Sequence, residues 1–550
     1  MAETLTIGIA IGPNGPRAWE AAMLRELSNI PGIVATLLQF DNADDAPAPL
    51  AYRLFERFDN AVFGLAEDPL ATVPLDSGLP RPRAEASTLA RFDLLVVLTD
   101  VAARQAQAIP MGRLGALTVV TLDAEGRDCQ PPGYWEVMRS VPVTRIGVRW
   151  LTADGGNRLV LHSCSSTADF SPRRNREPLF WKAHAFIPRL LRRLDPHRLD
   201  PDNLFPEVLP ERPDPSWVEA MPPASTGGIC HGALSLAFET TAAHAPGYGY
   251  PRIATLAHHL ARKTPDLFRF YHHAKLTREQ WFLMFRFSEH PTSDLTQFTP
   301  ILPPTDRIWA DPHIMKREGR HYVFIEEMLF KENKGFISVL TIDEDGRHSQ
   351  PVKVLERDYH LSYPQVFEYR GEIYMLPETS GNRTIELYRC ERFPDRWTLE
   401  TVIMDDIDAV DSSLLFDNGR WWLFCSIKPH PAASENDELH LFHSDDLLSG
   451  NWRPHPENPV ISDVRFARPA GKPYRHLGRR IRPSQNCAGI YGYGFNLNVI
   501  TRLDENRYRE EPLVSVNAGQ HPGLIGTHTY AREGRLTVVD ACRRISHPLI

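Results

Sequence analysis

The chain has 550 residues, of which 42% are hydrophobic and 24% charged, and its 61 basic and 69 acidic side chains give a net charge of −8. A single hydrophobic core stops growing at roughly 250–300 residues, so this length predicts two or more domains. The acidic balance, without a block of lysine or arginine, argues against a nucleic-acid-binding protein.

The N-terminus gives no sign of a secretion signal. It reads MAETLTIGIAIGPNG and places an acidic residue where such a signal carries positive charge. No stretch reaches the roughly 18 unbroken apolar residues of a membrane-spanning helix. We therefore expect a cytoplasmic protein without an integral membrane segment. The seven cysteines are scattered without a CxxC pair, which favours reduced thiols over disulfides or a zinc site.

Residues 1–195 have the pattern of an α/β domain. The apolar runs LTIGIAIG, IVATLLQF, FDLLVVLTD and ALTVVTLD alternate with helical stretches such as PRAWEAAMLRELSNI. Nearly continuous apolar strands separated by amphipathic helices are typical of a buried parallel sheet. A two-strand element follows, TRIGVRWL and NRLVLHSC, and then a helix at about residues 176–194.

A proline-rich linker is predicted over residues 196–226. Eight prolines occur between Pro196 and Pro223. Proline at this density is incompatible with a helix or a central strand, so the segment should be an extended and fairly stiff connector.

Residues 227–550 change to short, aromatic-rich strands after one helix near residues 253–263. A first strand, a turn containing glycine and an aromatic second strand recur from Ala310, Ser362, Val410 and Gly526, with a looser copy from Pro483. A period of about fifty residues is typical of a β-propeller, and five blades fit the length. The earlier strand WFLMFRF would complete the last blade and close the ring.

Two of these copies resemble the five-bladed propeller glycosidases, the clan of arabinanases, β-xylosidases, invertases and levansucrases. The similar segments are WADPHI and VDSSLLFDNGRWWLF. The resemblance implies a central funnel in which Asp311 acts as base or nucleophile and Asp411 orients or tunes its partner. It also places His528 where some members have an axial calcium; no other cofactor is predicted.

A second resemblance is longer and spans about residues 306–544. The segments HLSYPQVFEYRGEIYMLPETS, LYRCERFPDRW, NWRPHPENPV and RPSQNCAGIYGYG are similar to the N-terminal region of plant glucosamine inositolphosphorylceramide transferases. This resemblance makes a carbohydrate or a glycolipid headgroup the expected partner.

Glycoside cleavage needs one protonated and one ionised carboxyl group. The clan takes its acid from a later blade, where this chain has Gln485, which cannot donate an acidic proton. Glu378 and the pair Glu326-Glu327 are the substitutes for this general acid.

The predicted catalytic residues are Asp311, Asp411 and Glu378. Substrate binding is predicted for Trp309, Glu326, Tyr363, Gln365, Arg482, Gln485 and His528. Turn capping, strand-end solvation, salt bridges between blades and aromatic packing, including that of Tyr491, are the structural alternatives.

The first domain resembles the formyltransferase fold of methionyl-tRNA and sugar N-formyltransferases over about residues 80–195. The segment PPGYWEVMRSVPVTRIGVRWLTADGGNRLVLHS carries the similarity and puts Asp154 at the family's catalytic aspartate. The family also needs an Asn-x-His pair, and ALTVVTLDAEG has neither residue. We therefore expect a degenerate scaffold or ligand-binding module, with Asp154 a turn residue.

Three functions compete. The first is a glycoside hydrolase or transglycosylase acting in the propeller funnel on an intracellular glycan, glycolipid headgroup or sugar precursor. The second is a non-catalytic glycan-binding propeller, which Gln485 favours. The third is an amino-sugar N-formyltransferase whose propeller holds the substrate. The sequence ranks the first ahead, and it predicts neither the sugar nor the oligomeric state.

Overall fold

The structure is a computed structural model of the whole chain. It describes residues 4–12, 14–39, 48–74, 89–98, 112–123, 126–152, 155–194, 249–292 and 294–546. The predicted linker at 196–226 lies outside these ranges. The described residues form two compact units: the first holds those up to 194, with 249–267 and Pro429–Ser434, and the second holds 268–428 and 435–546.

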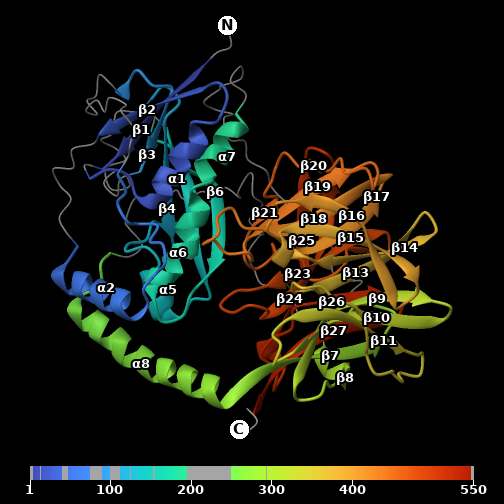
Figure 1. Cartoon of the computed structure of the whole chain (residues 1–550). Helices are drawn as coiled ribbons and strands as arrows, with labels where there is room; N and C mark the ends of the chain where they lie inside the picture. Colours follow the sequence, from blue (N-terminus) through green and yellow to red (C-terminus); the bar gives the residue numbers. More distant parts are fainter. Residues whose placement is uncertain are drawn as a thin grey trace. The chain divides into compact units, whose positions relative to one another are not determined.

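The first unit is built on one six-stranded sheet in the order β2-β1-β3-β4-β5-β6 (Figure 1). The strands β1, β2, β3 and β4 are parallel, and β5 and β6 are antiparallel, which confirms the predicted two-strand element. The strands are β1 (Leu5–Ile11), β2 (Ile33–Gln39), β3 (Leu94–Val97), β4 (Ala116–Leu122), β5 (Val143–Leu151) and β6 (Asn157–Ser166). Its helices are α1 (Ala18–Leu27), α2 (Leu50–Val62), α5 (Tyr134–Arg139), α6 (Pro172–Ala183) and α7 (Phe186–Arg192).

The core of this unit lies between the sheet and helices α1, α6 and α7. Ile7 and Ile9 of β1 are fully buried there against Trp19 of α1 and Leu179 of α6. Apart from Thr6, β1 is apolar along its length because it lies inside the sheet, between β2 and β3.

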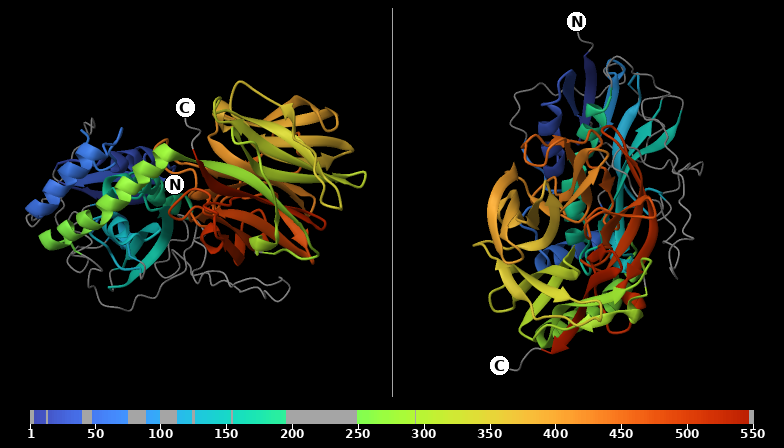
Figure 2. Two further views of the ribbon diagram at one scale, coloured as in Figure 1. Left: turned by 90° about the horizontal axis from the view of Figure 1, so that it is seen from below. Right: turned by 90° about the vertical axis from the view of Figure 1, so that its right-hand side faces the viewer.

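Helix α8 (Ile253–Leu276) is longer than the sequence predicted. The sequence predicts a helix that ends near Lys263, and the residue before a proline disfavours helical geometry. The helix instead continues through Pro265, and the hydroxyl of Thr264 donates to the carbonyl oxygen of Leu260 at 2.7 Å. Figure 2 shows α8 leading directly into β7. No helix in the described ranges combines the length and the apolar character needed to cross a bilayer.

The second unit is a five-bladed β-propeller, as predicted. Blade one is β9 (Arg307–Arg317), β10 (Arg320–Leu329), β11 (Gly335–Ile342) and β12 (Val352–Leu355). Blade two is β13 (Ser362–Tyr369), β14 (Glu372–Glu378), β15 (Thr384–Arg392) and β16 (Arg396–Asp405). Blade three is β17 (Ala409–Asp417), β18 (Arg420–Ile427), β19 (Glu438–Ser444) and β20 (Arg453–Pro454), and β21 (Ile461–Ser462) also pairs with β19. Blade four is β22 (Tyr474–His476), β23 (Arg479–Asn486), β24 (Gly494–Leu503) and β25 (Tyr508–Asn517). β23 is therefore its second strand, whereas the repeat from Pro483 had made it the first.

The fifth blade closes the ring with strands from both ends of the propeller. It contains β26 (Tyr530–Glu533), β27 (Leu536–Ser546), β7 (Thr277–Phe287) and β8 (Thr299–Ile301). β7 pairs with β27 from Thr277 opposite Ser546 to Phe287 opposite Leu536. This confirms the prediction that WFLMFRF completes the last blade. Closure of this kind removes the open sheet edges that a linear array would expose.

Candidate functional site

The first strands of three consecutive blades carry the same distortion. In blades one, two and three the pairing of the first with the second strand shifts by one residue, and each bulge contains one residue in the left-handed region. These residues are Asp311, Tyr363 and Asp411, with φ of 51°, 47° and 52°. Such a backbone is uncommon for aspartate and strained for tyrosine. Because bulges re-aim side chains and are enriched beside active sites, this repeated bulge marks the candidate site.

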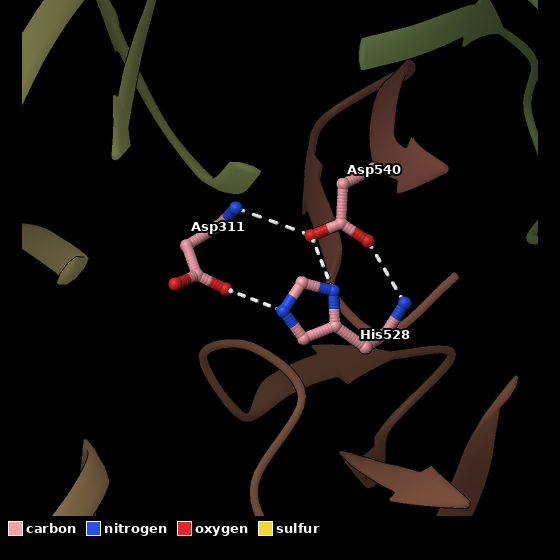
Figure 3. Close-up of side chains that lie close together, drawn as sticks. All are labelled: Asp311, His528 and Asp540. Atoms are coloured by element: carbon pink, nitrogen blue, oxygen red, sulfur yellow. Dashed lines mark hydrogen bonds and ion pairs between the residues drawn. The ribbon is translucent and has the colours of Figure 1, made fainter. Parts of the chain in front are cut away.

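Asp311 lies at the centre of a buried hydrogen-bond network with His528 and Asp540 (Figure 3). The Asp311 backbone N–H donates to Asp540 Oδ2 at 3.1 Å, and the Thr529 hydroxyl donates to Asp311 Oδ1 at 2.8 Å. His528 Nε2 is 3.3 Å from Asp311 Oδ1, and its Nδ1 is 2.8 Å from Asp540 Oδ2. One imidazole therefore bridges two carboxylates from different blades.

The charges in this network stabilise one another. Burial alone would lower the pKa of His528, but Asp540 and Asp311 raise it to about 10. Burial alone would raise the pKa of Asp311, but His528 and the Thr529 hydroxyl hold it at about 2. At neutral pH the network therefore contains an imidazolium at His528 beside an ionised carboxylate at Asp311.

Asp311, His528 and Asp540 also bring one possible metal-ligand atom each to within 4.8 Å of one another. A metal-bound histidine must be neutral, and calcium takes six to eight oxygen ligands. Here both His528 nitrogens face carboxylate oxygens, while Asp540 also accepts the N–H groups of Asp311, His528 and Thr529. The axial calcium near His528 stays a prediction.

Asp411 occupies the equivalent bulge of blade three and has different partners. Its Oδ2 accepts hydrogen bonds from Arg468 Nε at 2.5 Å and Gln485 Nε2 at 2.7 Å. All three side chains are buried. Burial raises the pKa of Asp411, and the Arg468 guanidinium opposes that rise. The structure therefore brings the predicted Asp411 and Gln485 together and adds Arg468.

Two glutamates lie at equivalent positions of neighbouring blades. Glu378 faces Ser362, and Glu326 faces Ala310, the residue before the bulge. Both oxygens of Glu378 accept hydrogen bonds, from the Asp411 N–H at 3.0 Å and from the Ser380 hydroxyl at 2.8 Å. The predicted Glu378 is therefore engaged with the Asp411 bulge.

Glu326 has a different environment from Glu378. Its Oε1 is 3.1 Å from His360 Nε2. Burial raises the pKa of Glu326, the charge of Asp311 adds to the rise, and His360 opposes it. The charge of Asp311 also acts on Asp411, so the two bulges are electrostatically connected. Glu326 is thus the carboxyl group beside Asp311 whose surroundings favour its protonated form.

The other predicted substrate-binding residues are buried and make contacts within the protein. The Trp309 indole donates to Glu327 at 3.3 Å. The Tyr363 hydroxyl contacts Ser413 at 2.9 Å and accepts the Gly471 N–H. Gln365 exchanges two hydrogen bonds with the backbone of Leu414 in the next blade. Arg482 binds both Glu510 oxygens at 2.6 Å.

Two aromatic side chains flank His528 and leave part of their surface accessible. Trp281 lies with its ring centroid 4.2 Å from that of His528, and Tyr491 approaches the imidazole edge-on at 5.3 Å. The Arg468 guanidinium lies 4.9 Å from the centre of the Tyr491 ring. Tyr491 is 46% exposed and contacts both the Asp311 and the Asp411 networks. It is therefore the site residue best placed to meet a sugar ring.

In the first unit, the formyltransferase resemblance implies that an Asn-x-His pair would be needed at the end of β4. The residue after β4 is Asp123, whose Oδ2 accepts a hydrogen bond from Arg127 Nε at 2.8 Å. Asp154 lies outside the described residues. The formyltransferase-like character of this unit stays a prediction.

Fold and site together define a five-bladed propeller with a centre of buried carboxylates on its first strands. Residues 303–538 match the family described as "Glucosamine inositolphosphorylceramide transferase 1, N-terminal". This match confirms the longer resemblance found in the sequence. It covers less than half of the chain and lies within the propeller.

The similar curated proteins carry the same description. The chain is 36% identical over 207 residues to glucosamine inositolphosphorylceramide transferase 1 of Oryza sativa subsp. japonica, a match covering 37% of this chain and 28% of the relative. The Arabidopsis thaliana protein of that name is 33% identical over 204 residues, which cover 36% and 26% of the two chains. The chain thus spans about a quarter of the length of these relatives.

Solved structures similar to this chain include glycoside hydrolases. The catalytic domain of the GH62 α-L-arabinofuranosidase of Coprinopsis cinerea aligns at 14% identity and a TM-score of 0.33, covering 42% of this chain and 90% of that one. A family 117 glycoside hydrolase of Zobellia galactanivorans aligns at 11% identity and a TM-score of 0.33, covering 48% and 91%.

Proposed function

We propose that the propeller cleaves or transfers a glycosidic bond, with Asp311 as the ionised base or nucleophile and Glu326 as the general acid. The observation that carries this proposal is the pairing of β9 with β10, which brings Glu326 opposite the residue next to Asp311. Glycoside chemistry needs two such carboxyl groups in opposite protonation states.

The surroundings of the two groups support these roles. His528 and Thr529 stabilise the negative charge of Asp311, whereas burial and that same charge favour a protonated Glu326. Environments that separate two carboxyl pKa values in this way are how one site holds both an acid and a base at one pH. Glu326 would thereby supply the proton that Gln485 cannot.

We propose a glycolipid headgroup as the substrate class, since the similar proteins from Oryza sativa and Arabidopsis thaliana are described as glucosamine inositolphosphorylceramide transferases. Tyr491 would stack on one sugar ring, and Arg468 and Asp411 would hold the adjoining part of the headgroup. A free glycan or a sugar precursor offers the same hydroxyl chemistry and belongs in the same assay.

A glycan-binding propeller without catalysis is the second candidate. It is favoured by Asp411, because Arg468 and Gln485 both donate to the same carboxylate oxygen of this residue. An Asp411 carboxylate held by these two donors would suit the binding of a glycan as well as its cleavage.

The test combines turnover and calorimetric binding on a panel of nitrophenyl glycosides and glycosylated inositolphosphate headgroups. The wild-type protein should turn over at least one substrate, and Asp311→Asn should bind it without turnover. Glu344→Gln is the matched control, since Glu344 is exposed in blade one. Binding without turnover in the wild type would reject the enzyme in favour of the second candidate.

A further inference from the structure

His360 connects blades one and two through both nitrogens of its ring. It precedes β13, and its side chain is 40% exposed. Nδ1 accepts a hydrogen bond at 3.0 Å from the N–H of Gly335, the buried first residue of β11. Nε2 lies 3.1 Å from Oε1 of Glu326 on β10. The imidazole is therefore fixed at both nitrogens, although part of the ring is accessible.

The bond from Gly335 determines which ring nitrogen of His360 carries the proton. A backbone N–H can only donate, so Nδ1 must accept and cannot itself carry a hydrogen. The proton of the neutral ring is then on Nε2, and Nε2–H donates to Glu326 Oε1. His360 is thus a hydrogen-bond donor to Glu326, and it has no free lone pair with which to act as a base.

Close packing around Gly335 keeps these groups together. A Cβ at this position would lie 2.5 Å from the Leu361 carbonyl oxygen, 2.8 Å from His360 Cε1 and 2.9 Å from Glu326 Oε1. The Leu361 N–H also donates to the Gly335 carbonyl oxygen at 3.0 Å. The absence of a side chain at Gly335 therefore allows the imidazole and the carboxyl group to meet.

Three carboxyl groups act on the His360 ring. Burial lowers its pKa, but the bond to Glu326 and the charges of Glu326, Glu378 and Asp311 raise it above its ordinary value. A second proton could go only to Nδ1, where it would leave the buried Gly335 N–H without an acceptor. The Gly335 bond therefore opposes protonation of His360 and favours the neutral ring.

The two oxygens of Glu326 consequently differ. Oε1 faces His360 Nε2–H, whereas Oε2 has no hydrogen-bond partner in the part of the chain that the structure describes. In Glu378, the glutamate at the equivalent position of blade two, both oxygens accept hydrogen bonds. Glu326 is thus the member of this pair with an oxygen left for a substrate.

We propose that His360 is a positioning residue for Glu326: its Nε2–H makes Oε1 the acceptor, so that the acid proton is on Oε2. This inference rests on the proposed glycoside chemistry. In that reaction the proton passes from Oε2 to the leaving oxygen as the bond between that oxygen and the sugar carbon breaks. Asp311, or a water that it activates, bonds to the sugar carbon. Nε2–H then stabilises the negative charge left on Glu326.

Two variants of the full chain separate the two bonds of His360. His360→Gln keeps an N–H group near the place of Nε2, whereas His360→Asn keeps an acceptor near Nδ1 but is too short to reach Glu326. The pKa of Glu326 is measured from its carboxyl ¹³C signal and from the pH dependence of kcat/KM on an alkyl glycoside. His360→Asn should raise it by about one pH unit, because the carboxylate loses a donor. His360→Gln should keep the wild-type value.

The loss of activity on the alkyl glycoside at high pH should move upward by the same amount in His360→Asn, since the acid must be protonated to act. His348→Asn is the matched control, because His348 is an exposed histidine of blade one, and it should change neither measurement. Urea unfolding of each variant checks that the propeller is intact.

The ¹⁵N spectrum of the imidazole rings tests the tautomer directly. The His360 signals, identified by their absence in His360→Gln, should be those of a neutral ring protonated at Nε2 from pH 6 to 8. Protons on both nitrogens at pH 7 would overturn the proposal, as would an unchanged Glu326 pKa in His360→Asn. Absence of turnover together with the expected pKa shift would reject the glycoside chemistry but support the arrangement at Glu326.

Discussion

The replacement Asp540→Asn tests whether the network around Asp311 depends on charge. Asp540 accepts backbone hydrogen bonds from Asp311, His528 and Thr529, and it faces His528 Nδ1 at 2.8 Å. Asparagine keeps the shape but removes the charge and turns one acceptor into a donor. Breaking a buried ion pair in this way costs about 3–5 kcal/mol. The free energy of unfolding of the propeller at pH 7 should fall by that amount.

The pH dependence provides a second, more specific magnitude. The pKa of His528 is about 10 in the folded chain and about 6.5 in an unfolded one. A tenfold change in proton affinity is about 1.4 kcal/mol, so the protonated state of His528 contributes on the order of 5 kcal/mol. This contribution is fully present below pH 6.5 and disappears as the pH rises through 10. In the Asp540→Asn protein the loss should again begin near pH 6.5, but it should be smaller and should be complete at a lower pH.

The assay is urea unfolding from pH 6 to 10, followed by tryptophan fluorescence. Glu510→Gln is the matched control, because it removes an equally buried carboxylate whose partner is Arg482 and not a histidine. It should destabilise the propeller without changing the pH dependence in this range. An Asp540→Asn protein with wild-type stability and an unchanged pH profile would refute the reasoning.

Three further predictions concern the contacts between blades. Gly471→Ala should abolish folding or lower the free energy of unfolding in urea by more than about 3 kcal/mol, because a Cβ at this position would lie 2.1 Å from the Tyr530 carbonyl oxygen. Wild-type stability of this variant would contradict the close packing of these strands. Tyr363→Phe should lower the free energy of unfolding by about 1–3 kcal/mol, because the buried Gly471 N–H loses its acceptor; an unchanged urea midpoint would show that this bond contributes nothing. Asp411→Ala should cost about 3–5 kcal/mol by leaving Arg468 buried without its closest carboxylate, whereas a double variant that also replaces Arg468 with methionine should recover part of the loss in the same assay.

Much of the propeller could be predicted because its signals are local. Turns such as Asn418-Gly419, where both residues have positive φ, define the hairpins, and the aromatic strands between them repeat. The repeat placed Asp311 and Asp411 at equivalent positions, where the structure has bulges. The closing strand could be predicted because the last blade otherwise lacked one.

The partners of these aspartates could not be predicted in the same way. Asp540 contacts Asp311 across 229 positions of sequence, and Arg468 reaches Asp411 from a loop without a repeat motif. The one available signal for Asp540 was an acidic residue in the apolar strand LTVVDA. Counting back from the turn at Gly319 would pair Glu326 with Asp311, but the bulge shifts its partner to Ala310. Such shifts follow from packing around the propeller axis, which a single sequence does not encode locally.

The central claim is that Asp311 and Glu326 divide the base and acid roles between them. The most direct measurement compares turnover by Glu326→Gln on two glycosides of the same sugar, one with a nitrophenyl leaving group and one with an alkyl alcohol. A good leaving group departs without protonation, so Glu326→Gln should keep most activity on the nitrophenyl glycoside and lose it on the alkyl glycoside. Asp311→Asn should lose both. Equal loss of the two activities in Glu326→Gln, or wild-type activity on the alkyl glycoside, would contradict the assignment of Glu326 as the acid.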